Sequence, residues 1–76
     1  MTADDEYSER AKRLLRTEMV RRAVSYEALA EKLTAIGLPE TAVNLRNKVS
    51  RGKFTAAFML AVCDALDIST ISTRAP

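Results

Sequence analysis

The sequence contains no histidine, only one cysteine and only two glycines. Without histidine the chain cannot build a Ser-His-Asp triad, a Cys-His pair or a zinc site that needs imidazole. A single cysteine, Cys63, allows neither an internal disulfide nor an all-cysteine metal site, and it is typical of a reducing compartment. Gly37 and Gly52 are too few for a glycine-rich phosphate loop. We therefore expect no enzyme, no catalytic residue, no metal and no cofactor.

The chain also lacks a long apolar run. The longest, residues 56–63, is far shorter than the roughly 20 residues that span a bilayer. The acidic N-terminus has no apolar segment of the kind found in signal peptides. We expect a cytoplasmic protein with no membrane partner. Its 76 residues, 47% of them apolar, suffice for one small globular domain, which dimerisation would help to stabilise.

The net charge is only +2, but the charges are unevenly distributed. Residues 2–9 carry four acids and no base, whereas residues 10–22 carry six bases against Glu18 alone. Residues 40–54 carry four bases against Glu40 alone. Gathering positive charge into two segments suits an anion-binding surface, although solvated helix faces explain the charge count equally well.

Hydrophobic periodicity and capping residues predict a compact all-α domain of four helices. Ser25 and Thr55 are good N-caps, and Gly37 is expected as a left-handed C-cap. Pro39 is expected in the first turn of the third helix, where its missing N–H is tolerated. The expected helices are 7–23, 26–36, 39–50 and 56–68. The domain then covers residues 7–68, between a flexible acidic tail (1–6) and a flexible C-terminal tail (69–76).

The first expected helix has an apolar stripe with a carboxylate in its middle. Glu18 lies in that stripe, so we expect it to form a structural ion pair with Arg22 or with a base of the third helix. The apolar positions are Tyr7, Ala11, Leu14, Leu15 and Met19. The bases that point elsewhere, toward solvent or phosphate, are Arg10, Lys12, Arg13, Arg16 and Arg21.

The third expected helix has a narrow apolar side and a wide polar side. Ala42, Leu45 and Val49 form an inward stripe, and Asn44 and Asn47 lie one turn apart among basic residues on the outer side. An amide-bearing, basic helix suits base edges and a phosphate backbone. A solvent-exposed helix of no special use is the alternative.

The fourth expected helix is apolar around most of its circumference. Such a helix is either wholly buried or covered in part by another chain. We expect a dimer surface at Leu60, Asp64 and Asp67, although a single exposed leucine is common on any protein surface. Cys63 is expected to be a small hydrophobic residue and not a nucleophile.

The order of these elements resembles the phage-repressor-like helix-turn-helix domains of the lambda repressor, Cro and XRE type, over roughly residues 10–68. V-S-Y-E-A-L-A-E-K-L looks like the first helix of that motif, and A-V-N-L-R-N-K-V-S-R-G looks like its recognition helix and exit turn. The segment between Leu33 and Arg51 is several residues longer than is usual there, and Ala23 replaces the glycine before the second helix. The chain is more closely similar to short bacterial proteins of uncharacterised function with the pattern Y-x-x-L-A-x-x-L…N-L-x-x-K-x-x-R-G-x-F-x-A-A-F.

The resemblance implies a lambda-repressor-like fold and a set of DNA contacts. Asparagine can bond adenine bidentately, Val43 can contact a thymine methyl, and Arg51 can reach a guanine edge. The implied base contacts are Glu40, Thr41, Val43, Asn44, Asn47 and Arg51. The implied phosphate contacts are Arg16, Ser25, Tyr26, Arg46, Lys48 and Lys53.

We therefore hypothesise a sequence-specific, dimeric regulator that binds double-stranded DNA in the bacterial nucleoid, with no small-molecule ligand evident. The alternative is a protein-interaction module, a helix-turn-helix fold that binds a partner protein instead of DNA. The acidic N-terminus and the apolar fourth helix favour that alternative.

Overall fold

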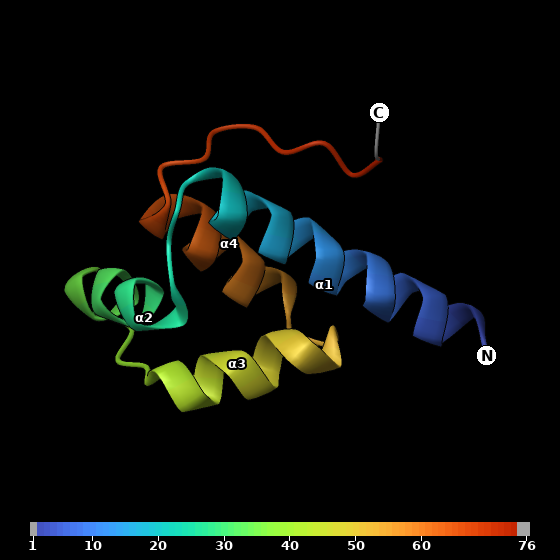
Figure 1. The fold of residues 1–76 in the computed structure, drawn as a ribbon, viewed down its shortest axis with the longest axis horizontal. Helices are drawn as coiled ribbons and strands as arrows, with labels where there is room; N and C mark the ends of the chain where they lie inside the picture. Colours follow the sequence, from blue (N-terminus) through green and yellow to red (C-terminus); the bar gives the residue numbers. More distant parts are fainter. Residues whose placement is uncertain (1, 75–76) are drawn as a thin grey trace.

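The computed structural model describes residues 2–74, which form four α-helices and no β-strand (Figure 1). The helices are α1 (Ala3–Arg21), α2 (Tyr26–Ala35), α3 (Ala42–Arg51) and α4 (Ala56–Ala65). Helix α3 packs against both α1 and α2, and α4 packs against α2. The predicted fold class, a compact all-α domain of four helices, is confirmed.

All four helices begin in the same way, with a hydroxyl residue as N-cap. Its side-chain oxygen accepts a hydrogen bond from the backbone N–H three residues later and so satisfies one of the unpaired donors of the first turn. The four N-caps are Thr2, Ser25, Thr41 and Thr55. The predictions for Ser25 and Thr55 are therefore confirmed.

Helix α1 starts earlier than predicted. Thr2 and Asp5 form a capping box, in which each side chain bonds the backbone N–H of the other. Asp4, Asp5 and Glu6 occupy the first turn, where the helix dipole favours negative charge. The assignment of residues 1–6 to a tail is thus wrong for residues 3–6, which belong to α1. Met1 lies outside the described residues.

Helix α3 starts later than predicted. Its N-cap is Thr41, whose hydroxyl accepts the Asn44 N–H at 3.1 Å, and its first residue is Ala42. Pro39 and Glu40 lie in the linker between α2 and α3 and are not helical. The expected start at Pro39 is wrong because the threonine cap comes after it.

The chain takes a left-handed conformation after each helix. The residues are Ala23 (φ 54°), Gly37 (φ 94°), Gly52 (φ 65°) and Asp67 (φ 58°). Gly37 has the predicted left-handed conformation, although the C-cap residue of α2 is Ile36, one position earlier. After α4, the N–H of Ile68 returns to the carbonyl of Cys63 at 2.8 Å, as in a Schellman motif. Helix α4 therefore ends at Ala65, and the predicted extension to Ile68 is wrong.

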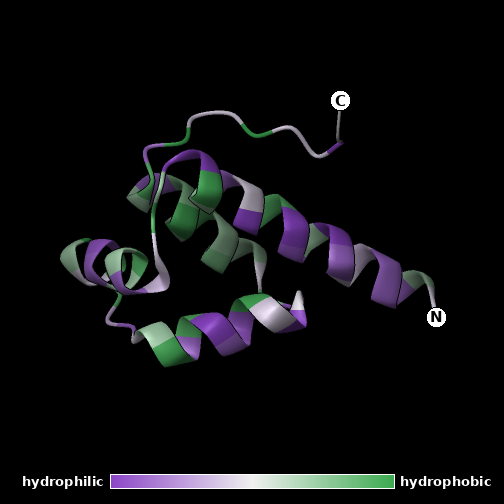
Figure 2. Ribbon diagram, in the orientation of Figure 1, coloured by the Kyte–Doolittle hydropathy of each residue, from purple (hydrophilic) through white to green (hydrophobic). Residues whose placement is uncertain are grey.

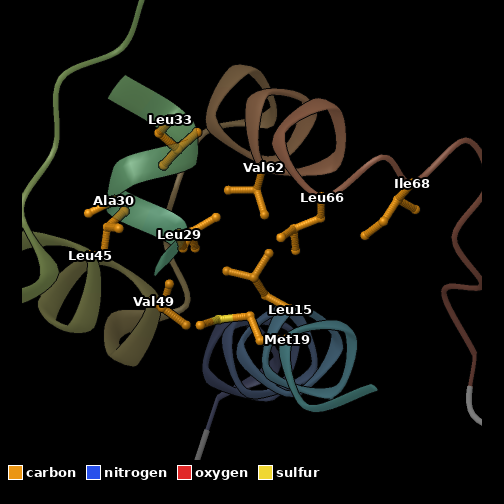
Figure 3. Packing of buried hydrophobic residues seen from close by; sticks show 10 residues of the cluster. All are labelled: Leu15, Met19, Leu29, Ala30, Leu33, Leu45, Val49, Val62, Leu66 and Ile68. Atoms are coloured by element: carbon orange, nitrogen blue, oxygen red, sulfur yellow. The ribbon is translucent and has the colours of Figure 1, made fainter. Parts of the chain in front are cut away.

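The hydrophobic core lies where the four helices meet (Figure 3). Its buried residues come from every helix and from the turn after α4: Leu15, Met19, Leu29, Ala30, Leu33, Leu45, Val49, Val62, Leu66 and Ile68. Tyr7, predicted on the apolar face of α1, is 64% exposed and is not part of the core. Beyond α4, Ile71 packs against the core, although residues 69–74 form no helix. Residues 75 and 76 of the expected C-terminal tail lie outside the described residues.

Glu18 is the one charged residue buried in the described part of the chain, with an exposed fraction of 7%. Its Oε1 accepts a hydrogen bond from Nη1 of Arg22 at 2.5 Å, and its Oε2 lies 3.3 Å from Nη1 of Arg21. Arg22 also donates from Nε to the carbonyl of Leu66 at 3.2 Å. The predicted ion pair with Arg22 is confirmed, and it links the end of α1 to the end of α4.

Candidate nucleic-acid interface

Helix α3 is fixed to the domain by one side and leaves the other free. Leu45 and Val49 are fully buried against α1 and α2, and Ala42 is half-buried. The opposite side carries Val43, which is 62% exposed, and the exposed side chains of Asn44 and Asn47. Arg51, in the last turn, is also exposed. Four of the six predicted base-contact residues therefore share one solvent-facing surface.

The other two predicted base contacts are engaged inside the protein. Thr41 caps α3, and its hydroxyl oxygen accepts the Asn44 N–H. Glu40 turns toward Lys48, whose Nζ donates to Glu40 Oε2 at 2.8 Å, and the Glu40 side chain is only 15% exposed. Lys48 also lies over the ring of Phe58, 4.8 Å from its centroid. The Glu40 side chain therefore does not lie on the solvent-facing surface with Asn44 and Asn47, and its prediction as a base contact differs from the structure.

A cluster of polar side chains joins α1, α2 and α3 beside the exposed side of α3. Arg16 donates from Nε to the hydroxyl of Tyr26 at 3.3 Å and from Nη2 to Oγ of Ser50 at 3.1 Å. Arg46 lies over the ring of Tyr26, with its Cζ 5.3 Å from the ring centroid, and its Nη2 lies 3.8 Å from Oε1 of Glu27. We call Arg16, Ser25, Tyr26 and Arg46 the junction cluster.

The junction cluster surrounds a shallow pocket of about 350 Å³. Ser25, the N-cap of α2, lies in its wall, so the N-terminus of α2 opens onto it. Met19, Val20 and Val24 supply its apolar side. The structure thus brings together four residues that the sequence resemblance assigned to phosphate contacts.

Lys53 lies at the other end of α3, away from the junction cluster. Its Nζ forms an ion pair with Asp4 in the first turn of α1 and donates to Oγ of Ser8 at 3.1 Å. The hydrogen bond to Asp4 raises the pKa of Lys53 above its ordinary value. This predicted phosphate contact is therefore already paired with a carboxylate of the same chain.

The partners of these cations could not be read from the sequence. The sequence pattern placed Asp4 in an N-terminal tail. No local pattern linked Ser8 to Lys53 or Ser50 to Arg16. Such contacts arise between segments 34 to 49 residues apart in the chain. The capping box T-x-x-D at Thr2 is the one local pattern that would have revealed that Asp4 is helical.

The predicted dimer residues lie on and just after α4. Leu60 is 67% exposed, and Asp64, one turn later, and Asp67, in the turn after the helix, are also exposed. Figure 2 shows hydrophobic colour along most of α4, in contrast to the hydrophilic α1. Burial raises the pKa of the neighbouring Cys63 thiol, as expected for a residue that acts as a small hydrophobe.

Residues 2–74 contain no group of three or more histidine, cysteine or acidic side chains arranged to hold a metal ion. No helix among them is both long and apolar enough to cross a membrane.

One protein family matches residues 7–71, which is most of the chain: the family described as a domain of unknown function, DUF6471. The chain belongs to the DUF6471 family. The match covers all four helices of this DUF6471 domain except the first turn of α1. No curated protein and no solved structure matches the chain.

Proposed function

We propose that this DUF6471 domain is a sequence-specific regulator that binds double-stranded DNA with α3 in the major groove. The observation that supports this most directly is the two-sided character of α3. Leu45 and Val49 are fully buried, while Asn44, Asn47 and Arg51 on the other side are exposed to solvent. A protein major-groove reader needs such a helix, rigidly held and exposed along one side.

The exposed side chains suit base recognition. An asparagine amide can donate to N7 and accept from the N6 amino group of adenine, and arginine can donate to O6 and N7 of guanine. Val43, at the start of α3, is an apolar group of the size that contacts a thymine methyl. These residues form the proposed reading surface.

The junction cluster supports a role in holding the DNA backbone. Arg16 and Arg46 flank Tyr26, and the N-terminus of α2 lies beside them. Phosphate oxygens are commonly bound by arginines, hydroxyl groups and helix N-termini together, and such contacts set the register of a protein on the duplex. The order of helices, which resembles that of phage-repressor-like domains, agrees with this arrangement.

The proposal includes a symmetric dimer formed through α4, located in the bacterial cytoplasm with the nucleoid. Leu60 is a large exposed side chain on the most apolar helix of the domain. Two copies related by a two-fold axis would present two α3 helices about 34 Å apart to a near-palindromic site. Sedimentation of Leu60→Glu beside the wild type tests this part. A wild-type dimer that the variant converts to a monomer is expected, and identical monomers would contradict it.

The DNA proposal is tested by selecting bound duplexes from a random pool and measuring affinity over a salt series. Asn47→Ala and Arg51→Ala should weaken binding to the selected site by about 1–3 kcal/mol each. Lys32→Ala, an exposed basic residue on α2, serves as the control and should change affinity little. Equal affinity of wild type and both α3 variants for every duplex would refute the proposal.

A protein-interaction module is the second candidate. It is favoured by Leu60, a large apolar side chain that is exposed on the mostly apolar α4. The salt series separates the two. With six or more phosphate contacts, DNA affinity should fall by roughly 10³-fold between 50 and 200 mM salt. No duplex binding at low salt, together with an intact fold, would favour the interaction module.

A further inference from the structure

A second positively charged site lies on the side of α1 away from α3. In Figure 1 the segment after α4 runs back along α1, on the opposite side from α3. Between this segment and α1 is a pocket of about 250 Å³. Its charged walls come from both segments: Arg10, Arg13, Arg21 and Arg74, with Glu18 as the one carboxylate.

The carboxylate of this pocket neutralises only part of its positive charge, because Glu18 pairs with Arg21 and with none of the other three arginines of the lining. Glu18 already accepts a hydrogen bond from Arg22 at 2.5 Å, and Arg21 lies 3.3 Å from its second oxygen. Arg13 makes no hydrogen bond or ion pair with the residues that the structure describes. Clustered arginines repel one another, and a bound anion would relieve that repulsion. Glu6 and Glu9 are the other acids of this part of α1, and Glu9 pairs with Lys12.

Contacts with α1 and with the core hold the C-terminal segment of the pocket in place. Arg10 donates from Nη2 to the carbonyl of Thr73 at 3.0 Å, and its guanidinium lies 5.3 Å from the Tyr7 centroid. Ile71 packs against the core and so holds the segment at α1. Thr17 adds a hydroxyl group to the walls, and Leu14 forms an apolar patch. The Ser72 hydroxyl donates to the carbonyl of Arg74 at 2.8 Å and so fixes the turn that carries Arg74.

The pocket is also separate from the proposed DNA surface. Arg16, on the same helix, turns toward Tyr26 and Ser50, whereas Arg10, Arg13 and Arg21 line the pocket. No residue of the pocket belongs to the junction cluster or to α3. A ligand here would leave α3 uncovered.

We propose that this pocket binds a pyrophosphate group, either free or as the terminal part of a nucleotide. Guanidinium groups bind phosphate oxygens in a planar, bidentate manner, and the Thr17 hydroxyl adds a donor. At about 30 Å³ per water molecule, the pocket has the volume of roughly eight waters, which is close to the volume of pyrophosphate. It is smaller than the roughly 300–1,000 Å³ of pockets that enclose drug-sized ligands, so a larger ligand would extend into solvent.

Calorimetric titration of the full chain with sodium pyrophosphate tests this inference without any DNA. It should be done at about 0.01 M salt, where screening is weak. One pyrophosphate per chain is expected to bind. Arg13→Gln and Arg74→Gln should each weaken binding about tenfold or more, the effect of losing a charge-assisted contact. Lys32→Gln, an equal charge change at an exposed position of α2 that lines neither pocket, should leave binding within about twofold.

Two further arms identify the source of the phosphate and locate the site. A nucleoside triphosphate that binds as tightly as pyrophosphate indicates a nucleotide ligand, and one that binds much more weakly indicates free pyrophosphate. Backbone NMR shifts on titration should be largest at Thr17, Ser72 and Thr73. No saturable binding, or equal loss in Lys32→Gln and Arg13→Gln, would overturn the proposal. Either result leaves the DNA proposal to its own test.

Discussion

Gly52 lies directly beneath the backbone of Ser8: a Cβ atom added to Gly52 would be 2.0 Å from the Ser8 carbonyl oxygen and 2.7 Å from the carbonyl carbon. No side chain fits in that space. The contact joins the turn after α3 to the N-terminal half of α1, so α1 lies over the end of the proposed recognition helix. Lys53, the next residue, reaches Ser8 and Asp4 on the same stretch of α1.

Gly52→Ala is therefore expected to destabilise the domain by more than the backbone conformation alone requires. A left-handed conformation costs a non-glycine residue about 1–2 kcal/mol, and the clash with Ser8 adds to this. Gly37→Ala is the matched control, because Gly37 also has a positive φ but has nothing within 4 Å of its Cβ position. Urea denaturation should show a clearly larger loss for Gly52→Ala. Equal losses would mean that the contact with Ser8 yields easily.

Glu18→Ala should also destabilise the domain, by about 2 kcal/mol or more. The substitution removes the acceptor for the part-buried Arg22 and leaves a gap at the edge of the core. Glu9→Ala removes an ion pair of similar length, 2.7 Å to Lys12, from a carboxylate whose side chain is 43% exposed, against 9% for Glu18. It should have a much smaller effect, because a carboxylate that water still solvates contributes little through its ion pair. Thermal unfolding of both variants measures the difference, and comparable losses would argue against a structural role for Glu18.

Ala23→Gly should stabilise the domain by up to about 1 kcal/mol. Ala23 has φ 54° after α1, a conformation that glycine adopts without the steric cost that alanine bears. The opposite sign is expected for Ala57→Gly, in α4 at an exposed position, because glycine weakens a helix by roughly 1 kcal/mol. Chemical denaturation of the two variants checks the signs. A destabilising Ala23→Gly would show that the gain is outweighed by greater freedom of the unfolded chain.

Asp4→Asn should increase affinity for DNA, if α3 is the reading helix. The substitution removes the carboxylate that pairs with Lys53 and leaves this cation free to contact a phosphate. The slope of log affinity against log salt should steepen by about one unit, the amount for one more neutralised phosphate. Glu6→Gln changes the net charge equally in the same turn but has no ion pair with Lys53. Identical curves for the two variants would rule out competition by Asp4.

The stability of the domain should fall at alkaline pH through Cys63. Burial raises the pKa of the Cys63 thiol above its ordinary value of 9.0, so the folded state holds the proton more tightly than the unfolded state does. The contribution is complete below pH 9.0 and is lost as pH rises from there through the folded pKa. Cys63→Ala removes this dependence. Unfolding of both proteins between pH 8 and pH 11 should diverge only above about pH 9, and parallel curves would contradict the shift.

Features that depend on neighbours in the sequence were predictable. The caps at Ser25 and Thr55 and the left-handed Gly37 follow from short-range chemistry. The pairing of Glu18 with Arg22 follows from their spacing of one helical turn. The errors at the start of α1 and α3 came from competing local signals, since Thr2 and Thr41 cap the helices at positions that hydrophobic periodicity did not mark.

The directions of the charged side chains were not predictable. Lys53 pairs with Asp4 from 49 residues earlier, and Arg16 bonds Ser50 from 34 residues later. Glu40 pairs with Lys48 and does not lie on the proposed reading surface, because it belongs to the linker before the N-cap Thr41 and not to the first turn of α3. Several partners compete for each charge at similar energies, and only the packing of the helices decides which of them comes within reach.

The sequence by itself determined four helices, their order and the two-sided character of α3, because periodicity and capping act within one or two turns. Only the tertiary structure decided that α1 lies over the end of α3, that the basic residues of α1 divide between the junction cluster and a second pocket, and that Arg74 joins that pocket. These arrangements depend on contacts between distant segments. They form only when Leu45, Val49 and their partners in the core bring the helices together.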